Sequence, residues 1–127
     1  MDYFLSLLLS LGMGMEAAAH AIAQPRPATI TVAEGYLTPL NAAAIEQRLA
    51  DLPGWETDGE ALLHTRTFED FVAAIAFINQ LVEPAEALGH HPDITINYNR
   101  VSLELTTHDA GGITELDFQL AEKIAQL

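Results

Sequence analysis

The second half of the chain alternates apolar and polar residues in a way that is typical of strands. The apolar positions fall at every second residue in two neighbouring runs: Ile94, Ile96 and Tyr98, then Val101, Leu103 and Leu105. A period of two places such side chains on one face of a sheet, and Asn99 suits the turn between the runs. Trp55 to Thr57 and Ala61 to Phe68 form an earlier pair around Asp58-Gly59, a dipeptide favoured in tight turns. The pattern predicts two β-hairpins.

Three other segments repeat apolar residues at spacings of three and four, which predicts amphipathic helices. They comprise Thr38 to about Leu52, Glu69 to about Leu88, and Thr114 to Leu127. Thr38 followed by Pro39 has the form of a helix start, and Gly89 is well placed to end the second helix. The residues expected to face the sheet are Ile45, Leu49 and Leu52 in the first helix, Phe71, Ile75, Ile78, Val82 and Ala85 in the second, and Leu116, Leu120, Ile124 and Leu127 in the third.

The predicted order is helix, strand, strand, helix, strand, strand, helix. Two hairpins without a parallel crossover favour an α+β fold, in which a four-stranded antiparallel sheet carries three helices packed on one face. The 127 residues are enough for one such domain and too few for two. We assign this domain to residues 38–127. The uncovered sheet face and the sheet edges are candidates for self-association.

Residues 1–37 are expected to form a leader and linker outside the domain. Their apolar run, Phe4 to Leu11, is much shorter than the ~20 residues that a transmembrane helix needs. The run has the length of the apolar part of a signal peptide, but Asp2 stands where a basic residue is expected. We therefore predict a poorly ordered or non-native start and a cytoplasmic protein. Export is the alternative if residues 1–23 are a signal peptide.

Charge and composition exclude several classes of function. The chain has 18 acidic and 5 basic residues, which gives a formal net charge of −13 at pH 7. Such a charge repels phosphate backbones and anionic membrane surfaces, so we expect no direct nucleic-acid binding and no membrane association. The chain contains no cysteine, which excludes disulfides, thiolate metal sites and a cysteine nucleophile.

Three of the five histidines cluster with carboxylates in the last third of the chain. His90 and His91 follow the second predicted helix, His108 follows the last predicted strand, and Glu86 and Asp117 stand at the two ends of the cluster. Histidine exchanges protons near neutral pH without large tuning, and it is also a common metal ligand. The cluster therefore indicates proton-transfer chemistry or metal binding. The two remaining histidines stand alone, and we interpret them as ordinary core or surface residues.

The spacing of this cluster resembles the signature of the pterin-4a-carbinolamine dehydratase family. The matching positions are Glu86, His90-His91-Pro92, Tyr98, His108 and Asp117, and the flanking segments Leu52-Pro53-Gly54-Trp55, Phe68-Glu69-Asp70-Phe71, Tyr98-Asn99-Arg100-Val101 and Thr106 to Thr114 also look like family sequence. The resemblance covers about residues 38–127. A histidine pair alone is weak evidence, but the pair with a third histidine, an acid at each end and the flanking matches is highly specific.

The resemblance implies a dehydratase that converts a 4a-hydroxytetrahydropterin to the quinonoid dihydropterin and water, without metal, redox cofactor or covalent intermediate. The leaving hydroxide must be protonated while a ring nitrogen loses a proton, so the reaction needs an acid and a base. The implied proton-transfer pair is His90 and His91, with His108 as the third active-site histidine. The implied supporting or substrate-binding residues are Glu86, Pro92, Tyr98 and Asp117.

Some of these residues also have an ordinary structural interpretation. Asp117 lies three residues after Thr114, where an acid satisfies the amides of a helix start, so a capping role is at least as well founded as a catalytic one. Tyr98 suits a core position or a wall of the pocket equally well. Many family members carry an aromatic residue soon after the His-His-Pro triplet, where this chain has Asp93-Ile94-Thr95. Asp93 is instead a candidate partner for the amino-pyrimidine edge of a pterin.

Two competing functions follow from the same residues. Three histidines suffice as the protein ligands of an open zinc site, which would make the protein a zinc enzyme. Some animal relatives also serve as a dimerisation cofactor of a homeodomain transcription factor, so a non-catalytic interaction module is the second alternative. The family resemblance further implies a homodimer or a homotetramer, formed through helices or sheet edges.

Overall fold

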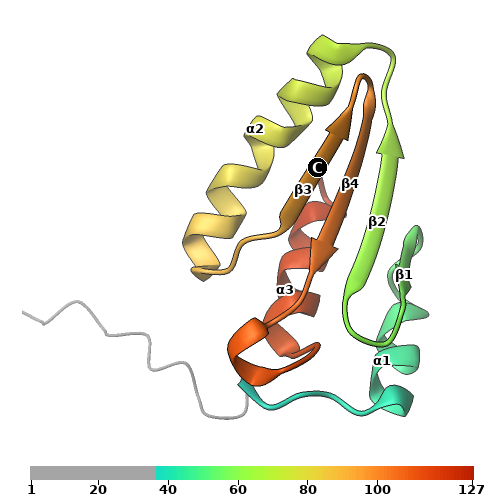
Figure 1. Cartoon of the computed structure of the whole chain (residues 1–127), viewed down its shortest axis with the longest axis vertical. Helices are drawn as coiled ribbons and strands as arrows, with labels where there is room; N and C mark the ends of the chain where they lie inside the picture. Colours follow the sequence, from blue (N-terminus) through green and yellow to red (C-terminus); the bar gives the residue numbers. More distant parts are fainter. Residues whose placement is uncertain (1–36) are drawn as a thin grey trace, which may run out of the picture. The chain divides into compact units, whose positions relative to one another are not determined.

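The computed structural model describes residues 37–127, and the predictions made for residues 1–36 lie outside this range. The elements follow the predicted order along the chain (Figure 1). They are α1 (Ala42–Leu49), β1 (Trp55–Thr57), β2 (Leu62–Thr67), α2 (Phe71–Leu88), β3 (Asp93–Asn97), β4 (Arg100–Leu105), a short 3-10 helix (His108–Ala110) and α3 (Glu115–Ile124). All four strands begin and end within one residue of their predicted bounds. Tyr98, predicted as the last residue of the third strand, lies in the turn.

The four strands form one antiparallel sheet in the order β1-β2-β4-β3 (Figure 1). The register places Leu62 opposite Leu105 in the central pair and Ile94 opposite Leu103 in the outer pair. Side chains of one parity therefore share a face, because successive residues of a strand point to opposite sides. The predicted α+β fold, with three helices on one face of a four-stranded antiparallel sheet, is confirmed.

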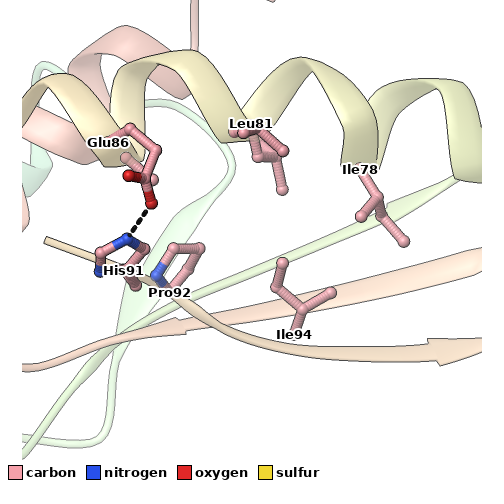
Figure 2. Close-up of a pocket in the computed structure, with 8 residues that line it drawn as sticks. Ile78, Leu81, Glu86, His91, Pro92 and Ile94 are labelled. Atoms are coloured by element: carbon pink, nitrogen blue, oxygen red, sulfur yellow. Dashed lines mark hydrogen bonds and ion pairs between the residues drawn. The ribbon is translucent and has the colours of Figure 1, made fainter.

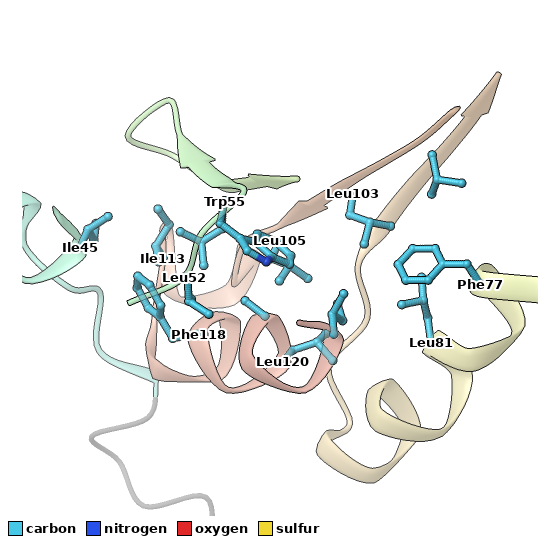
Figure 3. Close-up of a cluster of buried hydrophobic side chains, with 14 of the residues drawn as sticks. Ile45, Leu52, Trp55, Phe77, Leu81, Leu103, Leu105, Ile113, Phe118 and Leu120 are labelled. Carbon is cyan, nitrogen blue, oxygen red and sulfur yellow. The ribbon is translucent and has the colours of Figure 1, made fainter. Parts of the chain in front are cut away.

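The core lies between this apolar face and the helices, and all three helices contribute to it. Figure 3 shows Trp55, Leu103 and Leu105 of the sheet pointing into the same layer as Phe77 and Leu81 of α2 and Phe118 and Leu120 of α3. A second connection joins α1 to α3, since Arg48 binds Glu115 at 2.6 Å and lies over the Phe118 ring at 4.8 Å. The helices thereby cover one face of the sheet.

The first helix begins later than the sequence predicted. Its N-cap is Asn41, whose Oδ1 accepts the Ala44 amide at 2.9 Å, so the predicted start at Thr38 and Pro39 is wrong. The Leu40 amide is held by the carbonyl of Ile113 at 2.8 Å. This bond fixes the chain against the segment before α3 and delays the first helical turn to Asn41, a strong N-cap in its own right.

The apolar face of α2 is also shifted from the predicted one. The buried residues are Ala74, Phe77, Leu81 and Ala85, whereas Phe71 and Val82 of the predicted stripe are 49% and 58% exposed. The helix is apolar on more than one side, so its sequence does not by itself determine which side is buried. By length and composition (mean hydropathy 1.3) α2 alone among the described helices is long and apolar enough to cross a membrane, a weak criterion that core helices also meet.

The last helix keeps part of its predicted stripe. Leu120 and Ile124 are buried as expected, but the buried face also includes Phe118 and Ala121, and Leu127 is 41% exposed beyond the end of the helix. The inward prediction for Leu127 is wrong because α3 ends at Ile124 and the chain turns after it.

Candidate active site

The end of helix α2 positions His90 and His91. Gly89 ends the helix in the left-handed conformation, with φ of 59°, which a residue without a side chain adopts at little cost. The Gly89 amide donates to the Glu86 carbonyl, and the His90 amide donates to the Ala85 carbonyl. These two bonds close the last turn, so that the histidine pair leaves the helix in a fixed direction.

His90 turns inward and meets a buried carboxylate. Its Nε2 lies 2.6 Å from Oδ1 of Asp117, and the side chains are 11% and 0% exposed. The other carboxylate oxygen of Asp117 accepts the Thr114 amide at 2.8 Å and the Thr107 hydroxyl at 2.9 Å. A buried carboxylate needs such donors to offset its lost hydration. Asp117 therefore joins the residue after α2, the end of β4 and the start of α3.

Asp117 also starts helix α3. Thr114 is the N-cap, its Oγ1 accepts the Leu116 amide, and Asp117 returns a bond to the Thr114 amide, which completes a capping box. The sequence left capping and histidine support as alternatives for this residue. The structure shows both contacts at once, because the two oxygens of the carboxylate face in different directions.

His91 turns toward the surface at the end of an apolar groove. Its Nε2 lies 2.7 Å from Oε1 of Glu86, one turn back on α2, and both side chains are exposed. Figure 2 shows this pair beside Pro92, with Ile78 of α2 and Ile94 of β3 farther along the groove. The groove has a volume of about 160 Å³. Pro92 is half-buried and forms part of its wall.

His108 follows β4 and faces the open side of the sheet. It begins the 3-10 helix, which is closed by a bridge between Thr107 and Gly112. Its Nε2 lies 3.9 Å from Oδ2 of Asp93, and both side chains are largely exposed. His108 also lines a hollow of about 260 Å³ together with Glu104, Thr106 and the two glycines of the loop.

Tyr98 lies apart from these residues. It occupies the turn between β3 and β4, at the opposite end of β3 from Asp93, with φ of 55° and an exposed fraction of 66%. Of the two alternatives left open for Tyr98, the core position is wrong, because the hairpin turns one residue earlier than the alternation suggested. Tyr98 lines none of the hollows described here, and its place among the substrate-binding residues stays a prediction.

Sequence reasoning found the capping contact between Thr114 and Asp117 but missed Thr107, whose hydroxyl bonds the same carboxylate. Thr107 continues the inward alternation of Val101, Leu103 and Leu105, and it is 6% exposed. A polar residue at the next inward position after a strand is a signal for a buried hydrogen bond, and it was available in the sequence. Asp93, considered only for the substrate, is also the carboxylate nearest to His108.

The arrangement suits proton exchange. His90 and His91 each direct Nε2 at a carboxylate, which leaves Nδ1 of both rings as the nitrogen not engaged by that carboxylate. Within residues 37–127, no three histidine, aspartate or glutamate side chains are grouped so that they could hold a metal ion. The alternative of a three-histidine zinc site therefore finds no support in the geometry of these side chains.

This chain is similar in sequence and in structure to proteins named as pterin dehydratases. A protein of Cyanothece sp., provisionally named pterin-4-alpha-carbinolamine dehydratase, is 54% identical over 88 residues, which cover 69% of this chain and 91% of that protein. A protein of Thermosynechococcus vestitus with the same provisional name is 56% identical over 88 residues, 69% of this chain and 93% of its own. The crystal structure of a transcriptional coactivator/pterin dehydratase from Brucella melitensis is similar with a TM-score of 0.67 and 38% identity, over 70% of this chain and 97% of that one.

A sequence model of one family covers the whole domain predicted from the pattern. It is described as pterin 4 alpha carbinolamine dehydratase, and it matches residues 38–127, which include every histidine and carboxylate of the candidate site. The chain belongs to the pterin-4-alpha-carbinolamine dehydratase family.

Proposed function

We propose that this protein dehydrates a 4a-hydroxytetrahydropterin to the quinonoid dihydropterin and thereby returns a spent pterin cofactor to a form that a reductase accepts. The observation that carries the proposal is the pair of histidines after α2, each within 2.7 Å of a carboxylate, in a chain of this family. Relatives that share more than half of their aligned residues with it carry the corresponding name.

The reaction needs two proton transfers and no change of oxidation state. The bond between C4a and the hydroxyl oxygen breaks, and the oxygen takes up a proton to leave as water. The neighbouring ring nitrogen loses its proton, and its electron pair forms the new double bond to C4a. Since hydroxide is a poor leaving group, an acid must act as the bond breaks, and a base must accept the nitrogen proton.

The roles of the individual residues are part of this proposal, and their surroundings support them. His90 and His91 form the proton-transfer pair, held by Asp117 and Glu86. His108 orients the leaving hydroxyl, and its 79% exposed side chain is open to a substrate from solution. Asp93 lies beside it and offers a carboxylate to the amino-pyrimidine edge of the pterin, whose N–H groups are donors.

The test is the rate at which the absorbance of a 4a-hydroxytetrahydropterin decays with the full chain, in metal-free buffer. We expect acceleration by wild type, the same acceleration after chelator treatment, and its loss in His91→Ala. Glu56→Gln, an exposed carboxylate on β1, serves as the control and keeps the wild-type rate. A folded wild type without any acceleration refutes the proposal and favours the interaction module instead.

We further propose that the protein acts as a homodimer or homotetramer. Helix α2 exposes Phe71, Val72 and Val82, which are 49%, 74% and 58% exposed, and the groove beside edge strand β3 continues this apolar surface. Exposed apolar patches of this kind mark contact surfaces.

Light scattering at micromolar concentration should show an oligomer, and Val82→Asp should dissociate it. Gln80→Asp is the control, because it adds the same charge at an exposed polar position of α2 and should leave the oligomer intact. A monomeric wild type would contradict the proposal.

A further inference from the structure

We infer that Thr107 is a positioning residue for the proposed dehydration: its hydroxyl, oriented by Thr114, holds Asp117 so that His90 carries a proton on Nε2 and keeps Nδ1 for proton exchange. The inference rests on the proposed function for its kinetic consequence. Its structural content, the protonation pattern of one ring, stands independently of any activity.

The direction of the hydrogen-bond chain follows from counting protons. Thr107 Oγ1 lies 2.9 Å from Oδ2 of Asp117 and 2.7 Å from Oγ1 of Thr114. A hydroxyl has one proton, and a carboxylate can only accept, so Thr107 donates to Asp117 and receives the Thr114 proton. Thr114 Oγ1 in turn accepts the Leu116 amide. Each hydroxyl is thus a donor on one side and an acceptor on the other.

This chain fixes the carboxylate and therefore the imidazole. With Oδ2 held by Thr107 and by the Thr114 amide, Oδ1 remains for His90, at 2.6 Å from its Nε2. The ring nitrogen that faces a carboxylate oxygen must carry a proton, so the neutral form of His90 is the Nε2–H tautomer. In metal sites, hydrogen-bond partners orient the ligating histidines in the same way. Removing such a partner lowers metal affinity or activity by about ten- to a hundredfold.

Burial makes the arrangement specific. Thr107, Thr114 and Asp117 are 6%, 0% and 0% exposed, so water does not replace a missing hydroxyl. Among the described residues, no buried side-chain nitrogen or oxygen lacks a partner. Removing the Thr107 hydroxyl leaves both Oδ2 of Asp117 and the Thr114 hydroxyl short of one bond. Only the Thr114 amide then holds Oδ2, so the carboxylate rotates more easily about its bond to Cβ and its hold on His90 loosens.

The test compares Thr107→Val, which keeps the shape, with Thr107→Ser, which keeps the hydroxyl, in the full chain. We expect kcat for dehydration to fall about tenfold in Thr107→Val with KM within about twofold, and to recover to within about threefold of wild type in Thr107→Ser. Thr65→Val is the control, because Thr65 is an exposed residue of β2 whose hydroxyl bonds that of Ser102, away from the site. Thr107→Ala replaces the valine variant if the latter does not fold.

Long-range proton–nitrogen NMR of the 15N-labelled chain reads the ring directly, with His90 assigned by comparison with His90→Gln. Wild type and Thr107→Ser should show His90 as the Nε2–H tautomer, and Thr107→Val should show a mixture. An Nδ1–H tautomer in wild type overturns the inference, as does a folded Thr107→Val with unchanged kcat and spectrum. If wild type has no activity but the expected tautomer, the proposed function fails while the arrangement of the ring stands.

Discussion

Replacing Asp117 by asparagine tests how much the fold depends on the carboxylate that supports the site. Asparagine keeps the shape of the side chain but has one acceptor oxygen instead of two. If that oxygen stays on Thr114 and Thr107, the new NH₂ group faces His90 Nε2, where two donors cannot bond. The ring must then change its tautomer or move away, and either response alters the site as well as the stability.

The magnitude can be worked from the contacts of Asp117. A hydrogen bond to a charged group stabilises by about 1.5–3 kcal/mol, and the new tautomer would recover a neutral bond of about 1 kcal/mol. Loss of the negative charge at the start of α3 costs about 0.5 kcal/mol more. We therefore expect Asp117→Asn to lower the free energy of unfolding by about 2 kcal/mol, which lowers Tm by about 10 °C in a domain of this size.

Urea unfolding followed by the fluorescence of Trp55, the single tryptophan and 6% exposed, measures this difference. All variants are compared at one protein concentration, because association shifts apparent stability. Asp51→Asn, an exposed carboxylate beyond α1, should stay within about 0.5 kcal/mol of wild type. If Asp117→Asn is equally close to wild type and keeps its kcat, the carboxylate does not join cap and histidine as described.

Three further outcomes are expected. Gly89→Ala meets no atom within 4 Å but must adopt φ of 59°, so the free energy of unfolding should fall by about 1–2 kcal/mol; an unchanged value would contradict the strain. Phe118→Ala, which empties a fully buried position, should cost about 3–5 kcal/mol, and a loss below about 1 kcal/mol in urea unfolding would show that the core collapses around the gap. The amides of Glu60 and Ala61 donate to the Asp58 carboxylate and lower its pKa. The turn therefore gains stability at pH values above the ordinary aspartate pKa, and it loses this stability as the pH falls through the lowered pKa. A carbon-13 titration of the Asp58 carboxyl should find its midpoint below the ordinary range, and a midpoint at or above it would refute the cause.

The strands could be predicted because only one face of the sheet is buried. Alternation at Val101, Leu103 and Leu105 has a single interpretation, since a shift by one residue would bury serine and glutamate. Some contacts of the site could also be anticipated from the sequence. Glu86 and His91 are close in sequence across one helix end, and the family spacing indicated that Asp117 belongs with the histidines.

The errors arose where local sequence allows more than one answer. Helix α2 has apolar residues on several sides, so periodicity alone could not choose between Phe71 with Val82 and Phe77 with Leu81; packing against the sheet decided it. The start of α1 depends on a bond from Leu40 to a carbonyl that lies far along the chain. The alternation indicated that Thr107 is buried, but not its partners, because Thr107 meets Thr114 and Asp117 only after α3 packs.

The sheet order has a consequence for the way the chain folds. Each hairpin joins strands that are neighbours in sequence, whereas the central β2–β4 ladder, from Leu62 with Leu105 to Thr67 with Arg100, joins residues on either side of α2. Hairpins close short loops quickly, but this ladder closes a long one and carries most of the loop entropy of the fold. We expect docking of the two hairpins to be the slow step, so that substitutions along β2–β4 slow refolding while those in β1 mainly speed unfolding.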